Sequence, residues 1–335
     1  MIHLRIVAPE PKARATLEAL AGSDAVCNIV HLPRSAQRPD GDLILADVAR
    51  EDASMVIADL RGLGLDRDGS IALVEIDSHI SAHAEAAIRN AKGLPSDAVV
   101  WEEVEERTSE QVELSAVFLV FMVVAALLAA MGIYQNSAIL IVGAMVVGPE
   151  FGPLAGLCVA LVQRHVGLAR RSARALIVGF AVAIATVYLT TRLFRAVGLF
   201  NDDFSLENHT FANLISSPDF FTFFVAACAG VAGMLSLSTA KSGALIGVLI
   251  SVTTIPAAAN IGVAAAYQDW ESWRGSIEQL AINLASIVAA GTAVLAAQRA
   301  LYVRRRAKHL DDPERRAAGL PTPTSRATTR SRPSS

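Results

Sequence analysis

The sequence predicts a membrane-embedded all-α bundle of about six transmembrane helices that follows a small soluble α+β domain. Three observations support this fold class. The chain of 335 residues is 53% hydrophobic and has a mean hydropathy of +0.44, which is more apolar than an ordinary soluble domain. Long apolar segments begin only after residue 113. The charges are also divided, since residues 1–114 contain 11 Lys/Arg against 21 Asp/Glu, whereas residues 299–335 contain 10 against 3.

The first 78 residues are predicted to form a cytoplasmic domain with the element order βαββαβ. Apolar residues at helical spacing, such as Ala13, Leu17 and Leu20, mark its helices, and Gly22 and Gly64 end them. We expect strands at 2–8, 25–32, 43–48 and 70–76, and helices at 10–20 and 52–63. This order is that of the ferredoxin-like fold, which by analogy suggests a small regulatory domain.

Two further segments flank the predicted membrane domain of residues 114–305. Residues 79–113 are acidic and helical, and we expect either a solvated connector or a rigid lever between the domains. His79 and His83 are four residues apart here, but two histidines without a third ligand favour a solvated helix face over a metal site. Residues 306–335 are predicted to be a disordered basic tail, because they are rich in Pro, Ser, Thr and Arg.

The membrane domain is expected to cross the bilayer six times. The predicted spans are 114–133, 137–162, 173–190, 219–237, 242–266 and 280–298. Basic residues of the short loops gather on the side of the N-terminal domain, at Arg164, Arg170, Arg171, Arg174 and Lys241. The positive-inside rule therefore predicts that both termini are cytoplasmic, and the lack of a signal-peptide pattern predicts insertion through the first span.

The second predicted span is interrupted near its middle. Its 26 residues would reach about 39 Å as an unbroken helix, which is enough to cross a bilayer. Gly148, Pro149, Gly152 and Pro153 break it, and Glu150 adds a carboxyl group between the prolines. Non-helical backbone at membrane depth occurs only inside protein or beside a water-filled cavity. We therefore expect the first of two broken helices here.

A matching interruption is predicted in the fifth span, at Pro256. Both spans begin with a serine and an aliphatic run, and each is the middle one of three. Because three is an odd number, the second group of three would lie upside down relative to the first, as an inverted repeat. Paired interruptions in two such halves are typical of transporters whose site lies near the middle of the membrane.

Three stretches resemble a known family. They are GAMVVGP at 143–149, FGP at 151–153 and SVTTIPAAANIGVA at 251–264. They are similar to the prokaryotic hydrophobic membrane proteins grouped as domain of unknown function 389, in a form with a cytoplasmic N-terminal domain. The resemblance covers about residues 1–305 and implies a bacterial cytoplasmic membrane, but it implies no substrate. Many members are expected to carry an aliphatic residue at the position of Glu150.

Glu150 has two interpretations, which both stay open at this point. It is either an ion- or proton-binding group or a structural acceptor for amides that the break leaves free. The other candidate substrate- or ion-binding residues are Gly148, Pro149, Gly152, Pro153, Asn136, Thr253, Thr254, Pro256, Asn260, Asn283 and Lys241. Each polar residue among them either lines a solute site or forms an ordinary bond between helices. Lys241 is either an inside anchor or a group that attracts an anionic solute.

No cofactor, metal site or catalytic group is expected. The patterns of phosphate-binding loops, serine hydrolases and zinc peptidases do not occur in fitting contexts, so an enzyme is not predicted. The three cysteines are interpreted as small buried hydrophobic residues.

The sequence as a whole favours a protein that transports or conducts a small polar or ionic solute through the two broken helices. Its cytoplasmic domain would regulate this passage by binding a small ligand such as a nucleotide or an amino acid. The alternative is a membrane-anchored sensor that binds such a ligand without transport. The expected partners are the lipid bilayer and further copies of the chain, which would form a homo-oligomer, and no nucleic acid.

Overall fold

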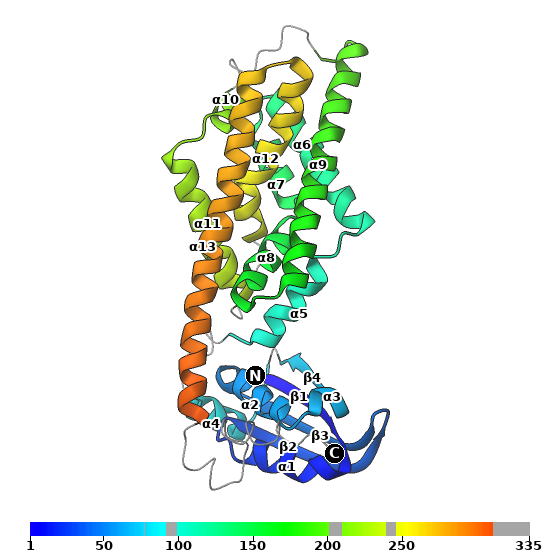
Figure 1. The fold of residues 1–335 in the computed structure, drawn as a ribbon, viewed down its shortest axis with the longest axis vertical. Helices are drawn as coiled ribbons and strands as arrows, with labels where there is room; N and C mark the ends of the chain where they lie inside the picture. The colour runs from blue at the N-terminus through cyan, green and yellow to red at the C-terminus, as the bar shows by residue number, and fades with distance from the viewer. Residues whose placement is uncertain (77, 92–98, 201–209, 239–245, 311–335) are drawn as a thin grey trace, which may run out of the picture. The chain divides into compact units, whose positions relative to one another are not determined.

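The computed structural model describes residues 1–76, 78–91, 99–200, 210–238 and 246–310. Contacts between Cα atoms divide the chain into two compact units, whose helices and strands are shown in Figure 1. The sheet unit contains the described residues up to 103, those from 298 onward, and Ser238. The helical unit contains the other described residues between 104 and 297.

The sheet unit is built on a four-stranded antiparallel sheet with the strand order β2-β3-β1-β4. Its strands are β1 (Ile2–Ala8), β2 (Val26–Gln37), β3 (Asp40–Val48) and β4 (Ser70–Glu75). Its helices are α1 (Glu10–Ala21), α2 (Arg50–Gly62), the short α3 (Leu65–Asp68) and α4 (Ala82–Asn90). The predicted order of strands and helices is present, with α3 added between α2 and β4.

Strand β2 is longer than the sequence predicted. The predicted strand ended at residue 32, and the next residue, Pro33, cannot donate a hydrogen bond to a neighbouring strand. However, β2 lies at the edge of the sheet with β3 as its neighbour, and its register with β3 shifts between Leu32 and Ala36. An irregularity on an edge strand accommodates proline, so β2 continues to Gln37.

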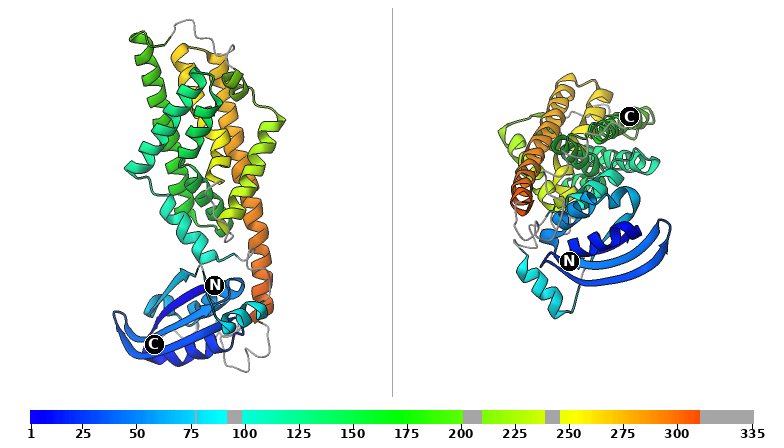
Figure 2. Two further views of the ribbon diagram at one scale, coloured as in Figure 1. Left: turned by 180° about the vertical axis from the view of Figure 1, so that it is seen from behind. Right: turned by 60° about the horizontal axis from the view of Figure 1, so that its bottom comes forward.

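The core of the sheet unit lies between one face of the sheet and the helices. Ile2, Leu4 and Ile6 alternate along β1 and are at most 2% exposed. Leu20 of α1 and Leu60 of α2 are fully buried in the same cluster, and Figure 2 shows α1 lying along the curved sheet. Burying each of these side chains contributes about 1.5–3 kcal/mol, so this face holds the unit together.

The end of helix α13 (Trp270–Leu310) also belongs to the sheet unit and contacts the start of α2. Tyr302 Oη donates a hydrogen bond of 3.4 Å to the carbonyl oxygen of Ser54. Arg305 Nη2 donates one of 3.3 Å to Asp52 Oδ1. These bonds attach the last turns of α13 to the first turns of α2.

Two charged residues at the start of α2 are buried. Arg50 is 7% exposed and donates to Glu75 Oε1 over 2.6 Å and to Glu103 Oε2 over 3.1 Å. Glu51 is also 7% exposed, and its carboxylate oxygens have no hydrogen-bond partner among the described residues. Burial therefore raises the pKa of the Glu51 carboxyl above its ordinary value of 4.5, and the charge of Asp52 adds to the rise.

Glu51→Gln is expected to stabilise the sheet unit at neutral pH. Because the folded chain binds the Glu51 proton more tightly than the unfolded chain, the stability from this group is fully present below pH 4.5 and is lost as the pH rises through the folded pKa. Glutamine cannot ionise, so the variant should melt above the wild type at neutral pH, and the difference should shrink toward pH 4.5. Thermal melts at several pH values, with amide exchange of β1 as the readout, measure this.

The control for this experiment is Glu85→Gln, which changes a carboxyl group whose side chain is 67% exposed. Its melting temperature should follow that of the wild type at every pH, because little desolvation is relieved. A Glu51→Gln melt that also follows the wild type at every pH would contradict the assignment.

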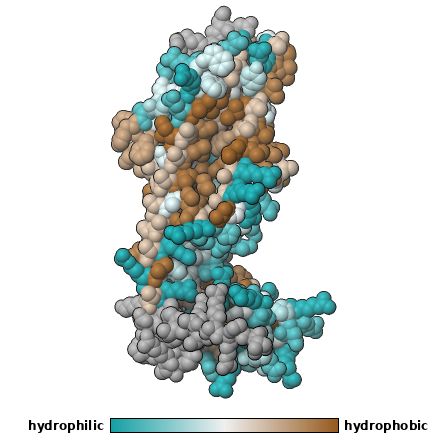
Figure 3. Space-filling model, viewed as in Figure 1, coloured by the Kyte–Doolittle hydropathy of each residue, from teal (hydrophilic) through white to brown (hydrophobic). Residues whose placement is uncertain are grey.

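Nine helices of the described residues contribute to the helical unit. They are α5 (Trp101–Gln111), α6 (Ala116–Tyr134), α7 (Ala138–Val147), α8 (Phe151–Gln163), α9 (Val166–Ala196), α10 (Thr210–Ser216), α11 (Phe220–Ser238), α12 (Ile246–Tyr267) and most of α13. Figure 3 shows apolar residues spread over the visible face of this unit. Helices α4 and α5 occupy parts of the segment that was predicted as a helical connector.

Several of these helices suggest a multi-pass membrane protein. Among the described residues, α6, α9, α11 and α13 are long and apolar enough to cross a membrane, and the bent pair of α7 and α8 is a fifth span if it is counted as one. The sequence predicted six spans. Helix α12 lies where the fifth span was predicted but is not among the helices that pass this test.

The prediction of a second broken helix is wrong. Helix α12 runs from Ile246 to Tyr267 without interruption, with Pro256 inside it. Pro256 is buried, and packed neighbours in an apolar bundle can satisfy the backbone group that a proline frees. The break is therefore confined to α7 and α8, and the proposed inverted repeat loses the similarity of its two interruptions.

Candidate functional site

The break between α7 and α8 places Glu150 at the start of a helix. Helix α7 ends at Val147, and Gly148 is extended, with φ −62° and ψ 124°, as residues before a proline usually are. The helix axis turns by 54° before α8 begins at Phe151. Pro153 is tolerated in the first turn of α8 because the amides there have no partner within the helix. The interruption that the sequence predicted at residues 148–153 is present.

Glu150 is fully buried in the helical unit. Its Oε1 accepts a hydrogen bond of 2.8 Å from Thr254 Oγ1 of α12, and both residues are 0% exposed. The bond joins the break to a helix more than 100 residues later in the chain, two residues before Pro256. Burying a carboxyl group in an apolar bundle is unfavourable unless polar groups surround it, so this bond marks the polar centre of the unit.

A hollow of about 470 Å³ lies beside the break. Gly148, Pro149 and Gly152 form one part of its wall, and Glu110 and Glu113 form another part. Both glutamates are exposed, so the hollow combines backbone of the break with acidic side chains in contact with solvent. Val117, Phe118, Phe121 and Phe151 also line the hollow, so its wall is partly polar and partly apolar.

Glycines of α8 allow the end of α5 and helix α9 to approach closely. A Cβ atom on Gly152 would lie 2.6 Å from Gln111 Cβ and 2.9 Å from the Gln111 carbonyl oxygen. A Cβ atom on Gly156 would lie 2.8 Å from Ser172 Oγ of α9. Small residues at such contacts are typical of helices packed in lipid, and here they position the break.

The other predicted polar residues lie in different places. Asn260 is fully buried on α12 and donates through Nδ2 to Ser276 Oγ of α13 over 2.8 Å. Asn283 is fully buried on α13. Asn136 is exposed in the turn between α6 and α7 and is separated from Glu150 by the length of α7, about 15 Å. Its φ of 49° explains why asparagine occupies this turn.

Two predicted residues cannot be placed in this site. Lys241 and the side chain of Thr253 lie outside the described residues. No group of three or more His, Cys, Asp or Glu in the described part of the chain could hold a metal ion.

Helix α13 carries a buried polar row that sequence analysis missed, apart from one member. The row consists of Ser272, Ser276, Gln279, Asn283 and Ser286, none of which is more than 8% exposed. Their alternating spacing of four and three residues places them on one face of the helix. This spacing is visible in the sequence and would have identified the row, had the polar residues of this segment been compared with each other.

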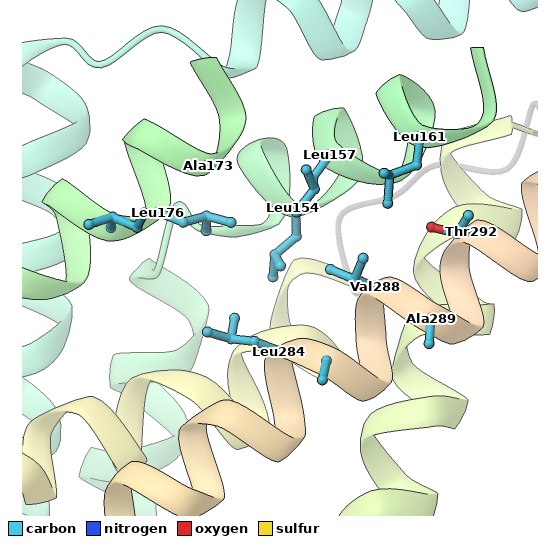
Figure 4. Close-up of a pocket in the computed structure, with 11 residues that line it drawn as sticks. Leu154, Leu157, Leu161, Ala173, Leu176, Leu284, Val288, Ala289 and Thr292 are labelled. Atoms are coloured by element: carbon cyan, nitrogen blue, oxygen red, sulfur yellow. The ribbon is translucent and has the colours of Figure 1, made fainter. Parts of the chain in front are cut away.

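A second hollow, of about 570 Å³, lies between α8, α9 and α13. Figure 4 shows that its walls are aliphatic side chains, among them Leu154, Leu284 and Val288, with Thr292 as the polar residue of the lining. None of the predicted site residues lines it. This lining suits a hydrocarbon chain and not a polar solute.

The break at residues 148–153, Thr254 and the whole polar row of α13 lie between residues 145 and 289. Residues 145–289 match the family model of a domain of unknown function, DUF389. For residues 145–289, this match confirms the family resemblance that the sequence motifs indicated. A curated relative, the uncharacterized protein MJ0678 of Methanocaldococcus jannaschii, is 27% identical over 196 residues. That alignment covers 57% of this chain and only 58% of the relative's length. No solved structure matches the chain.

Proposed function

We propose that this chain is an integral membrane protein that passes a small polar or ionic solute across the membrane at the break between α7 and α8. The proposal rests on the fully buried hydrogen bond between Glu150 and Thr254. Ionisable residues within membrane-spanning segments are rare, seldom face lipid and usually mark the path of an ion or substrate. A structural acceptor could be supplied by an uncharged side chain, so a carboxyl group here favours a functional role.

The surroundings of Glu150 support the same proposal. The start of α8 leaves backbone amides without helical partners, and a hollow adjoins the break at Gly148 and Gly152. Discontinuous helices supply such backbone groups to the solute in many transporters. The protein would act as a carrier or channel and not as an enzyme.

For the arrangement in the membrane, we propose six spans, with α12 as one of them. Its 22 residues correspond to about 33 Å of helix, enough for the apolar core of a bilayer. The basic residues of the loops favour both termini on the cytoplasmic side of a bacterial cytoplasmic membrane. We also propose a homo-oligomer in the bilayer, without nucleic acid as a partner.

The sheet unit would regulate this passage. Its strand order β2-β3-β1-β4 supports a ferredoxin-like arrangement, which suits a domain that binds a nucleotide or an amino acid. Helix α13 supplies the link, because its last turns bond to α2 within the sheet unit through Tyr302 and Arg305. A ligand that shifts α2 would act directly on the end of α13.

Flux into proteoliposomes tests the proposal, with protons, radiolabelled cations and amino acids as the solutes. Glu150→Gln should abolish or strongly reduce the flux, and Thr254→Val should reduce it about tenfold or more, since a hydrogen bond to a charged group is worth about 1.5–3 kcal/mol. Thr254→Ser keeps the hydroxyl group and is the matched control. Ligand binding by the sheet unit without flux of any solute would favour the membrane-anchored sensor instead.

A further inference from the structure

Two buried amide side chains of the helical unit have an oxygen without a donor. Asn260 is 0% exposed and Gln279 is 8% exposed, and each donates through its nitrogen, to Ser276 Oγ and Thr222 Oγ1 respectively. The oxygens Asn260 Oδ1 and Gln279 Oε1 have no hydrogen-bond partner among the described residues. Leaving such an oxygen unsatisfied costs about 1–3 kcal/mol, so buried amides normally meet water or a bound solute.

Rotating the Asn260 amide by about 180° would still leave one of its polar atoms without a hydrogen-bond partner among the described residues. Ser276 Oγ already donates its proton to the carbonyl oxygen of Ser272, over 2.8 Å. In this arrangement it accepts from the Asn260 amide nitrogen, and with the amide reversed the nitrogen would be the buried atom without a partner. The amide oxygen of Asn260 is left to a partner that the protein does not supply.

The polar row connects these amides to Glu150. Helices α12 and α13 run in opposite directions from the turn that joins them, and the bond between Asn260 and Ser276 fixes their register (Figure 1). Thr254 lies six residues further from the turn on α12, and Asn283 lies seven residues further on α13. At 1.5 Å per residue, both are about 9–10 Å deeper than the Asn260 bond. Asn283 therefore lies at the height of the bond between Thr254 and Glu150.

Toward the turn, the row reaches the end of the bundle. Beyond Ser276, the next polar residue of the row is Ser272, which is 8% exposed. Its backbone amide donates to Asp269 Oδ1 over 3.0 Å, and Asp269 is half-buried in the turn between α12 and α13. Polar groups thus follow one another from a solvent-accessible carboxylate to the height of Glu150.

A carboxyl group stands at each end of this line. Glu150 is fully buried at the inner end, and Asp269 is half-buried at the outer end. Arg195 lies half-buried near the same end, where it donates a hydrogen bond to the Ala266 carbonyl oxygen. Its guanidinium carbon lies over the Tyr267 ring, 4.4 Å from the ring centre. Acceptor oxygens and carboxyl groups in a low-dielectric interior attract cations and repel anions.

We propose that the polar row of α13, with Asn260, lines a water-filled path from the α12–α13 turn to Glu150, and that this path admits small cations and excludes anions. The proposal rests on the proposed function, since it names the class of solute that reaches the break. Water satisfies Asn260 Oδ1 and Gln279 Oε1 between passages, which explains why the protein leaves them without donors.

Cysteine labelling in proteoliposomes tests the path without knowledge of the solute. The native thiols are removed by Cys27→Ser, Cys158→Ala and Cys228→Ala, and single cysteines are then introduced by Ser272→Cys or Ser276→Cys. Each is exposed to a cationic and to an anionic methanethiosulfonate reagent of similar size, neither of which crosses a bilayer. We expect both positions to react, and the cationic reagent to react at least about tenfold faster at Ser276→Cys.

Ile277→Cys and Ala281→Cys are matched controls, because both residues lie on the outer side of the same helix and are exposed. In contact with lipid their thiols should react with neither reagent, since a thiol in hydrocarbon does not ionise. Serine and cysteine differ little in size, so the row variants should fold. Two row positions are tested so that the experiment remains informative if one variant fails to fold.

The outcomes separate this proposal from the proposed function. No reaction at either row position would overturn the path, even if Glu150→Gln still abolished flux. An equal or faster reaction with the anionic reagent would overturn the charge selectivity. Selective cationic labelling without any flux would support the path and count against transport.

Discussion

Arg50→Met is expected to destabilise the sheet unit by about 3 kcal/mol. The guanidinium is 7% exposed and bonds to Glu75 and Glu103, whose side chains are 34% and 18% exposed. Methionine keeps most of the length of arginine, but it leaves two carboxylates close together without their shared cation. Amide hydrogen exchange in β1 and β3 should therefore become faster by on the order of 100-fold.

The same substitution at Arg61 is the matched control. Arg61 lies on the same helix, but its side chain is 52% exposed and its nearest carboxylate, on Glu102, is 3.9 Å away. A contact as long as this one, made by an exposed guanidinium, contributes about 0–1 kcal/mol, so Arg61→Met should change exchange little. Equal acceleration by both variants would show that burial of the Arg50 pairs is not what stabilises the unit.

Gly230→Val is expected to destabilise the helical unit by about 3 kcal/mol or more. A Cβ atom on Gly230 of α11 would lie 2.6 Å from the carbonyl oxygen of Ile287 and 2.9 Å from its Cα atom. These are backbone atoms of α13, which cannot move aside as a flexible side chain can. The melting temperature of the protein in detergent should fall by roughly 6–12 °C.

Gly143→Val provides the comparison, because nothing lies within 4 Å of a Cβ atom at Gly143 of α7. Both variants replace glycine by valine within a helix, so differences in helix propensity cancel. If Gly230→Val melts at the same temperature as Gly143→Val, α11 and α13 do not pack as closely as described.

The strands and helices of the sheet unit could be predicted because their signals are local. Alternation along Ile2, Leu4 and Ile6 identifies a strand regardless of its neighbours. The order of the strands could not be predicted in the same way, because it depends on which distant segments bury each other. Pro33 shows this limit, since a proline ends a central strand but is accepted at the edge that β2 occupies.

The candidate site was predictable to a similar extent. Gly148 and Pro149 break a helix through their own backbone restrictions, so the break was visible. Pro256 leaves α12 intact because packing around it, which the sequence does not display, decides the outcome. The bond between Glu150 and Thr254 joins residues 104 positions apart, and only the fold brings them together.

Helix α13 is 41 residues long, which corresponds to about 62 Å of continuous helix. One part of it presents Asn283 and the rest of the polar row in the helical unit, and a later part presents Tyr302 and Arg305 in the sheet unit. The two sets of contacts are therefore made by one continuous hydrogen-bonded backbone. A proline introduced between them would break this helix, and the contacts of each unit would then be made by a separate helical segment.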